Sequence, residues 1–224
     1  MTKPPRPLEN RWYDDACGTA LALELVGERW SLLIVRELMF GGRRFSELKA
    51  SLGAISANIL TQRLDSLEAS GVLLRRKLPP PASVQVYELT PWGYDSEIAI
   101  QELGRWAAKS PLHDPTLPLS AASIMMSFRT MISRERAAGW DSRVGFRFGA
   151  EGFVAQVAGQ AITIERAEPE TADTLFDTDP MTLASLVYGG RPFADAEAAG
   201  VLRLGGDRAL AGRFVSLFVL PPKM

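Results

Sequence analysis

The chain has little of the chemistry from which enzyme and metal sites are usually built. Its 224 residues include one cysteine, Cys17, and one histidine, His113. One chain therefore cannot form an internal disulfide, and it lacks the Cys and His ligands of a zinc site. It contains no Gly-rich phosphate loop, no GxSxG motif and no conspicuous pair of carboxylates. We therefore expect no metal, no cofactor and no enzymatic activity.

Long apolar runs and an excess of one charge are also missing. No run of about 18 or more apolar residues occurs, and the opening MTKPPRPLEN lacks the apolar segment of a signal peptide. We therefore expect a soluble, cytoplasmic protein that does not enter a membrane. The net charge of -1 excludes a protein that coats nucleic acid nonspecifically, although specific binding needs only a local basic patch.

The length of the chain fits two modest domains, and its hydrophobic content of 46% is ample for two packed cores. Residues 111–120 carry three prolines and little periodicity, as is typical of a linker. We therefore expect one domain over residues 1–110 and another over residues 121–224.

The most informative segment begins at Phe45. Phe45, Leu48 and Leu52 share one helical face, and Gly53 then marks a turn. Ser56 is a plausible N-cap for a second helix, and Gly71 a plausible end. Two short helices joined in this way predict a helix-turn-helix. The second helix has an apolar side that is expected to be buried, made of Ile59, Leu60, Leu64 and Leu67.

The other side of the second helix carries short or planar polar side chains that can reach base edges in a major groove. After it, residues 72–77 and 84–90 read as two strands joined by a proline-rich connection, which predicts a wing beside the DNA backbone. In this interpretation the helix specifies the sequence and the wing positions the protein. The candidate DNA-binding residues are Arg43, Arg44, Ser56, Asn58, Thr61, Gln62, Arg63, Arg75, Arg76 and Lys77.

The alternative is an ordinary helical hairpin and β-hairpin whose charges are merely solvated. Local charge argues against it, because residues 40–77 contain seven Lys or Arg and three Asp or Glu, a net charge of +4. Near the start, Lys3, Arg6 and Arg11 suggest either an arm that reaches a minor groove or a solvated terminus.

Four short motifs in this half follow one another in a recognisable order: GERW at 27–30, GRRFSEL at 42–48, LTQRL at 60–64 and YELT at 87–90. Together they resemble the HxlR-type winged helix-turn-helix regulators of bacteria, over roughly residues 17–109. The resemblance implies a dimeric repressor or activator. It places the dimer contact on helices outside the helix-turn-helix and wing, here around residues 15–26 and 92–108.

Some HxlR-type relatives use a cysteine near the start of the domain to sense oxidants or electrophiles, which makes Cys17 a candidate redox site. In this chain Gly18 follows Cys17, where family members commonly have proline. The alternative is that Cys17 simply packs against its neighbours, since a lone cysteine on an apolar helix face is usually inert.

The second half predicts an α+β domain with helices on one face of a sheet. A helix is expected over residues 121–138, followed by a meander of antiparallel strands at 144–148, 152–157 and 160–166. Asp179 and Pro180 predict the start of another helix. The remaining expected elements are a possible strand at 173–178, a strand at 201–204 and a last helix after Asp207.

This half resembles the sterol-carrier-protein type of lipid-binding domain, through residues 178–183, 186–190 and 200–207. The resemblance implies an apolar tunnel between sheet and helices. A solid core is the alternative, because native cores leave few voids. The candidate ligand-binding residues are Met125, Phe128, Met131, Ile132, Phe146, Phe153, Phe176, Leu183, Leu186, Phe214 and Phe218.

The sequence as a whole thus predicts a mainly α winged helix-turn-helix domain followed by an α+β domain with an antiparallel sheet. The expected function is sequence-specific binding of a double-stranded DNA operator by a homodimeric transcriptional regulator. The second domain is expected to bind an apolar small-molecule effector or to support assembly. A lipid-binding or lipid-carrier protein with a vestigial winged helix is the alternative function.

Overall fold

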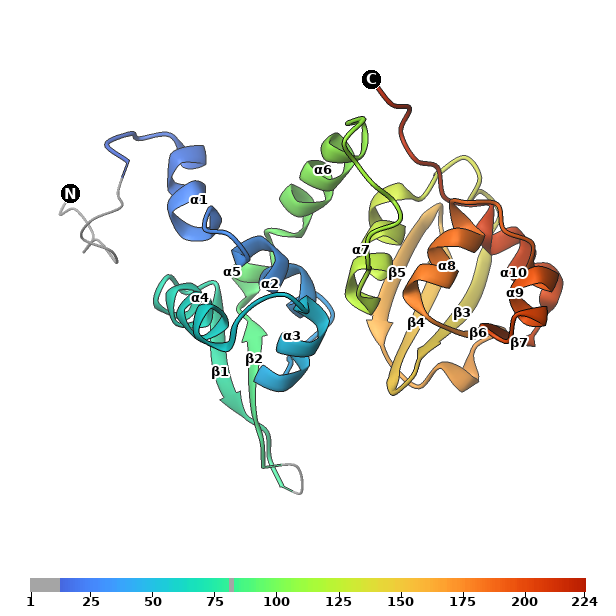
Figure 1. Ribbon diagram of the computed structural model, residues 1–224, viewed down its shortest axis with the longest axis horizontal. Coiled ribbons are helices and arrows are strands. Elements are labelled where there is room, and N and C mark those ends of the chain that lie inside the picture. Colours follow the sequence, from blue (N-terminus) through green and yellow to red (C-terminus); the bar gives the residue numbers. More distant parts are fainter. Residues whose placement is uncertain (1–12, 81–82) are drawn as a thin grey trace. The chain divides into compact units, whose positions relative to one another are not determined.

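The computed structural model describes residues 13–80 and 83–224 (Figure 1). The chain divides into two compact units, one ending at Glu97 and the other beginning at Ile98. Helix α6 (Glu97–Ala108) therefore lies almost wholly in the second unit, and the domain boundary expected at residues 111–120 stays a prediction. Arg105 of α6 donates a hydrogen bond to the carbonyl oxygen of Thr130, which ties the helix to the second unit.

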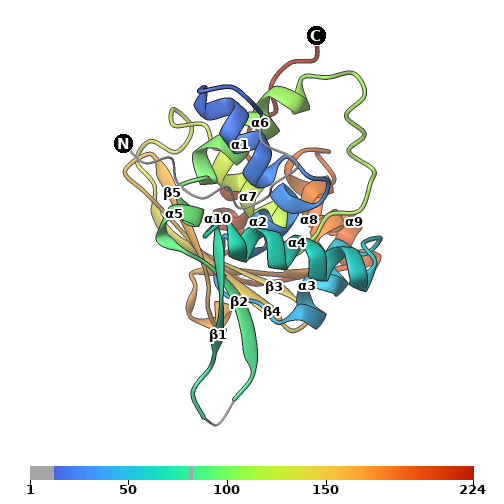
Figure 2. The same cartoon turned by 90° about the vertical axis from the view of Figure 1, so that its left-hand side faces the viewer.

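The first unit is a winged helix-turn-helix, as the sequence predicts. Its elements are α1 (Gly18–Val26), α2 (Ser31–Leu38), α3 (Phe45–Leu52), α4 (Ala57–Ala69), β1 (Leu73–Lys77), β2 (Gln85–Leu89) and α5 (Pro91–Tyr94). Leu48 of α3 and Leu60, Leu64 and Leu67 of α4 are fully buried, so the apolar sides of the two helices form the core. The two strands form an antiparallel hairpin that projects from the helices (Figure 2).

Local sequence signals fix the ends of α4. The Ser56 side chain accepts a hydrogen bond from the backbone N–H of Ile59, at 3.2 Å, and so satisfies a free donor of the first turn. Gly71 follows the helix with a φ of 76°, in the left-handed region that favours glycine. The hydroxyl of Thr90 donates to the Gly71 carbonyl, at 2.8 Å, which joins the end of α4 to the end of β2.

The second unit is an α+β domain around a five-stranded sheet of order β5-β4-β3-β6-β7. Its elements after α6 are α7 (Ala121–Met131), β3 (Asp141–Phe148), β4 (Glu151–Ala158), β5 (Ala161–Arg166), η1 (Pro169–Thr171), β6 (Thr174–Thr178), α8 (Pro180–Val187), α9 (Phe193–Ala198), β7 (Leu202–Gly206) and α10 (Arg208–Val215). The expected antiparallel sheet needs one correction, because β3 and β6 pair in parallel. Asp179 caps α8 through the backbone N–H of Thr182, and Pro180 is the first residue of that helix, as predicted.

The helix expected over residues 121–138 is shorter than predicted and ends at Met131. Ile132 adopts an extended conformation and forms a β-bridge with Phe218, while the N–H of Ser133 donates to the carbonyl of Leu217 at 2.8 Å. The apolar pattern that continues past Met131 therefore belongs to this bridge. Helix α9 was not predicted, because its N-cap, Pro192, offers no side-chain capping bond.

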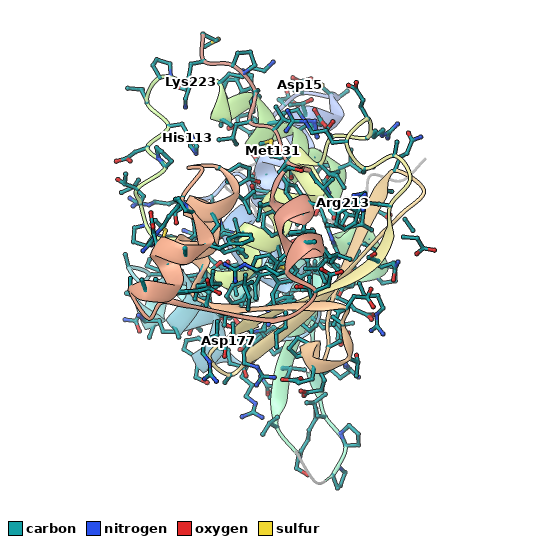
Figure 3. All side chains as sticks on the ribbon, turned by 90° about the vertical axis from the view of Figure 1, so that its right-hand side faces the viewer. Asp15, His113, Met131, Asp177, Arg213 and Lys223 are labelled. Atoms are coloured by element: carbon teal, nitrogen blue, oxygen red, sulfur yellow. The ribbon has the colours of Figure 1, made fainter. Side chains whose placement is uncertain are left out.

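The chain beyond α10 returns to the end of α6. Lys223 Nζ donates to the carbonyl oxygens of Ala108 and Ser110, at 3.0 and 2.9 Å, and lies 3.2 Å from His113 Nδ1 (Figure 3). These contacts place a cation at the C-terminal end of a helix, where it interacts favourably with the helix dipole.

Candidate nucleic-acid interface

Helix α4 presents a polar face to solvent. Asn58, Thr61, Gln62 and Asp65 follow the spacing i, i+3, i+4 and i+7, and all four residues are exposed. Ser56 is also exposed, but its hydroxyl already caps the helix. The structure therefore brings the predicted base-reading side chains together on one accessible helix face, with amide and hydroxyl groups that match the hydrogen-bonding pattern of base edges.

The wing hairpin lies beside this helix, because β1 follows α4 after a short turn and packs against it. Its register pairs Leu73 with Leu89 and Lys77 with Gln85. The side chains of the three predicted wing cations, Arg75, Arg76 and Lys77, are exposed. The hairpin can therefore reach a DNA backbone beside a groove that holds α4.

Two of the three wing cations are paired with carboxylates of the first unit. Arg75 contacts both Asp65 and Glu68 of α4, and Arg76 Nε lies 2.6 Å from Glu88 Oε2 on β2. Burial opposes the charge of Arg75, but its hydrogen bond to Asp65 and the nearby negative charges raise its pKa. Among residues 13–80 and 83–224 Lys77 forms no ion pair, so its charge is more available to a phosphate.

Arg43, one of the candidate DNA-binding residues, is largely buried. Arg43 is only 6% exposed, and its Nε lies 3.5 Å from Glu47 Oε2. Its backbone exchanges hydrogen bonds with Tyr87 of β2, at 2.9 and 2.8 Å. Arg43 therefore holds α3 to the wing, while the neighbouring Arg44 is exposed.

Arg63 also has an internal partner. Its Nη2 lies 2.9 Å from Glu28 Oε2 in the turn between α1 and α2, and its side chain is 16% exposed. At this position Arg63 is better suited to connect α4 to the α1–α2 turn than to bind a phosphate. Glu28, Glu68 and Glu88 were not predicted as partners, because ion pairs between residues far apart in the sequence leave no local pattern. The cationic Lys3, Arg6 and Arg11 lie outside the described residues.

The single cysteine lies at the N-cap of α1. Cys17 is exposed, and the donor groups of Thr19 and the backbone N–H of Ala20 at the start of the helix lower the pKa of its thiol. A lowered pKa raises the thiolate fraction near neutral pH. The redox role of Cys17 nevertheless stays a prediction.

Several of the predicted ligand-binding phenylalanines of the second unit pack in one aromatic cluster. The Phe128 ring centroid lies 4.3 Å from that of Phe218, 5.5 Å from that of Phe214 and 5.8 Å from that of Phe146. These direct ring contacts favour a packed core at this point. Ile132 is only half-buried and lies beyond the end of α7. The other predicted lining residues are buried: Met125, Met131, Phe153, Phe176, Leu183 and Leu186.

One polar pair lies at the edge of the aromatic cluster. The hydroxyls of Ser127 and Tyr188 are 2.7 Å apart, and the Tyr188 ring packs on Phe128. Burial raises the pKa of Tyr188, and the hydrogen bond with Ser127 only partly offsets this. Tyr188 therefore stays neutral at physiological pH.

Two further properties limit the kinds of site in the part of the chain that the structure describes. No helix there has both the length and the apolar character needed to span a membrane. Within the same residues, no cluster of three or more His, Cys, Asp or Glu is arranged to bind a metal ion.

Comparison with known proteins places this chain in a family. Residues 25–113 match the model of the HxlR-like helix-turn-helix family. An uncharacterized HTH-type transcriptional regulator of Bacillus subtilis, YvaP, is 35% identical over 88 residues, which are 39% of this chain and 82% of YvaP. This chain belongs to the HxlR-like family.

Other relatives match similar shares of this HxlR-like chain. The HTH-type transcriptional regulator YodB of B. subtilis is 36% identical over 38% of this chain and 77% of its own length. YtfH of Escherichia coli, an uncharacterized HTH-type transcriptional regulator, is 33% identical over 44% of this chain and 78% of its own. The solved structure of reduced YodB covers 45% of this chain and all of that chain, with 32% identity and a TM-score of 0.40. The resemblance of the second unit to sterol-carrier-protein domains stays a prediction.

Proposed function

We propose that this HxlR-like chain is a sequence-specific DNA-binding transcriptional regulator that acts as a homodimer. The observation that carries the proposal is the exposed polar face of α4 beside the wing hairpin. An α-helix fits the major groove of B-DNA, and the amide of a glutamine or asparagine can pair with adenine through two hydrogen bonds. In this proposal Asn58, Thr61 and Gln62 read bases, while Arg44, Arg76 and Lys77 contact phosphates.

Selection from a randomised pool of DNA duplexes tests the proposal. We expect the full chain to enrich one motif with two similar half-sites about 34–36 Å apart, one helical turn, because a dimer places two copies of α4 in successive major grooves. Retention of the selected duplex in a gel shift, against an excess of unrelated DNA, would confirm the preference. Enrichment of no motif would overturn sequence-specific binding.

The dimer part of the proposal rests on exposed apolar side chains of α1 and α6. Leu23 of α1 is 52% exposed, and on α6 Leu103 and Trp106 are 49% and 71% exposed. Large apolar side chains that share a helix face are typical of a surface that another protein covers. We therefore assign these helices to contacts between two copies of the chain.

Replacing Trp106 with glutamate should dissociate the dimer, because a charge would be buried without a partner in the contact. We expect sedimentation to show a monomer, with weaker binding to the selected duplex. Leu112→Glu is the matched control, since Leu112 is 90% exposed outside the helices. If the Trp106→Glu variant stayed dimeric, α6 would not be part of the dimer contact.

We also propose that the second unit either binds an apolar effector or supports assembly. An effector would have to bind the DNA-competent and DNA-incompetent forms of the dimer with different affinity, because equal affinity shifts no equilibrium. Because the rings around Phe128 already touch, a ligand would have to displace them or bind elsewhere in the unit. A lipid-carrier protein with a vestigial winged helix explains less, since it gives no reason for a polar face on α4 beside exposed cations.

A further inference from the structure

One ionic cluster joins the wing to the recognition helix. The Arg75 guanidinium on β1 contacts Asp65 through Nη2, and its Nε lies 3.0 Å from Glu68 Oε2. The backbone N–H of Arg75 donates to the other Glu68 oxygen, at 3.2 Å. The guanidinium carbon also lies 5.5 Å from the centre of the Tyr87 ring on β2. Arg75 therefore contacts α4 and both strands of the wing.

The charges of this cluster matter because of where they lie. Asp65 and Glu68 are on the recognition helix, and their side chains are 54% and 37% exposed. Asp65 follows Thr61 and Gln62 by about one helical turn, on the face proposed to enter the groove. Two unpaired carboxylates there would repel DNA phosphates, whereas one Arg75 leaves the cluster with a net charge of -1.

The other wing cation with a carboxylate partner differs in geometry. Arg76 pairs with Glu88, which lies on the opposite strand of the same hairpin, so this pair does not reach α4. Within residues 13–80 and 83–224, Arg75 is the only one of the three wing cations that forms an ion pair with α4. Its planar guanidinium suits two carboxylates and an aromatic ring at once, which an ammonium group does less well.

We propose that Arg75 is a positioning residue that acts through Asp65 and Glu68, and that it is not itself a phosphate ligand. It holds the wing at a fixed position against α4 and neutralises carboxylates that would otherwise face the DNA. This inference rests on the proposed DNA-binding function. It also changes the role that the sequence analysis gave to Arg75.

A double-mutant cycle on DNA affinity separates the two roles. Four forms of the full chain are compared on the selected duplex: wild type, Arg75→Ala, the pair Asp65→Asn with Glu68→Gln, and all three substitutions together. We expect Arg75→Ala to weaken binding about tenfold or more in the wild-type background. With the carboxylates neutralised, the same substitution should weaken binding less than about threefold, because residues in one ionic network are not additive.

The salt dependence gives a second, independent readout. Losing one phosphate contact lowers the slope of log affinity against log salt by about 0.9. In the neutralised background we expect Arg75→Ala to leave this slope unchanged. Equal losses of affinity in both backgrounds, or a slope reduced by about 0.9, would overturn the proposal and make Arg75 a phosphate ligand.

Matched controls keep the test informative. Arg76→Ala and Glu88→Gln make the same kinds of charge change within the hairpin. Because Arg76 is proposed to contact a phosphate itself, we expect Arg76→Ala to weaken binding and to lower the salt slope by about 0.9 with or without Glu88→Gln. Arg75→Lys keeps the charge and guards against a misfolded alanine variant. We expect it to bind more weakly than wild type, whereas full affinity would contradict a role that needs the guanidinium geometry. Binding of the wild type to the selected duplex tests the proposed function separately.

Discussion

Replacing Phe128 with alanine is expected to lower the unfolding free energy of the second unit by about 3–5 kcal/mol. Phe128 is fully buried on α7, and its ring packs on Phe146, Phe214 and Phe218 from a strand, a helix and the bridge that follows it. Removing the ring loses its burial and leaves a cavity among rigid neighbours. Chemical denaturation of the full chain measures the loss. The signal is tryptophan fluorescence, to which Trp140 contributes from beside Phe214 in the second unit.

The size of this loss also distinguishes a solid core from a tunnel. Phe193→Ala is the matched control, because Phe193 is half-buried and its ring contacts Phe176. We expect the control to cost less than half as much as Phe128→Ala. A loss below about 1 kcal/mol at Phe128 would contradict dense packing there and favour the apolar tunnel implied by the sterol-carrier-protein resemblance.

Replacing Gln62 or Thr61 with alanine is expected to cost about 1–3 kcal/mol of binding free energy on the selected duplex. Both side chains are exposed on α4 and make no core contact whose loss would unfold the helix. The loss should be confined to the cognate base pair, so that the variants no longer distinguish it from the other three. Dissociation constants on single-base variants of the site measure this preference.

The matched control for Thr61→Ala is Thr163→Ala, which removes an exposed threonine from β5 in the second unit. We expect the control to bind like the wild type. If Thr61→Ala and Gln62→Ala weakened binding to every sequence equally, the two residues would not read bases.

The helix-turn-helix was predictable from the sequence because its signals are local. The spacing of Leu60, Leu64 and Leu67 predicts the buried side of α4, and Ser56 and Gly71 mark its ends as the structure has them. Such caps and apolar periods depend on neighbours within a few residues, so one sequence suffices to find them.

The electrostatics of the same surface were not predictable in this way. The net charge of +4 was counted over residues 40–77, but Glu28 and Glu88 lie outside that range and pair with Arg63 and Arg76. Only folding brings these partners together, so a count along the sequence overestimates the positive field. The burial of Arg43 could not be predicted for the same reason, because its backbone pairs with Tyr87 on a strand far along the chain.

The second unit shows where periodicity misleads. Ile132 continues the apolar spacing of α7, yet it pairs with Phe218 in a bridge, because apolar residues near a helix end suit either conformation. The parallel pairing of β3 with β6 is likewise invisible locally, since β4 and β5 form an antiparallel meander with β3.

The central claim is that the polar face of α4 lies in the major groove of a preferred DNA sequence. The most direct test replaces N7 of each purine in the selected duplex, one at a time, with C–H, and measures affinity for the full chain. The account predicts losses of about 1–3 kcal/mol at a few positions one helical turn apart, and no further loss at the matching position for Gln62→Ala. Unchanged affinity at every purine would contradict it.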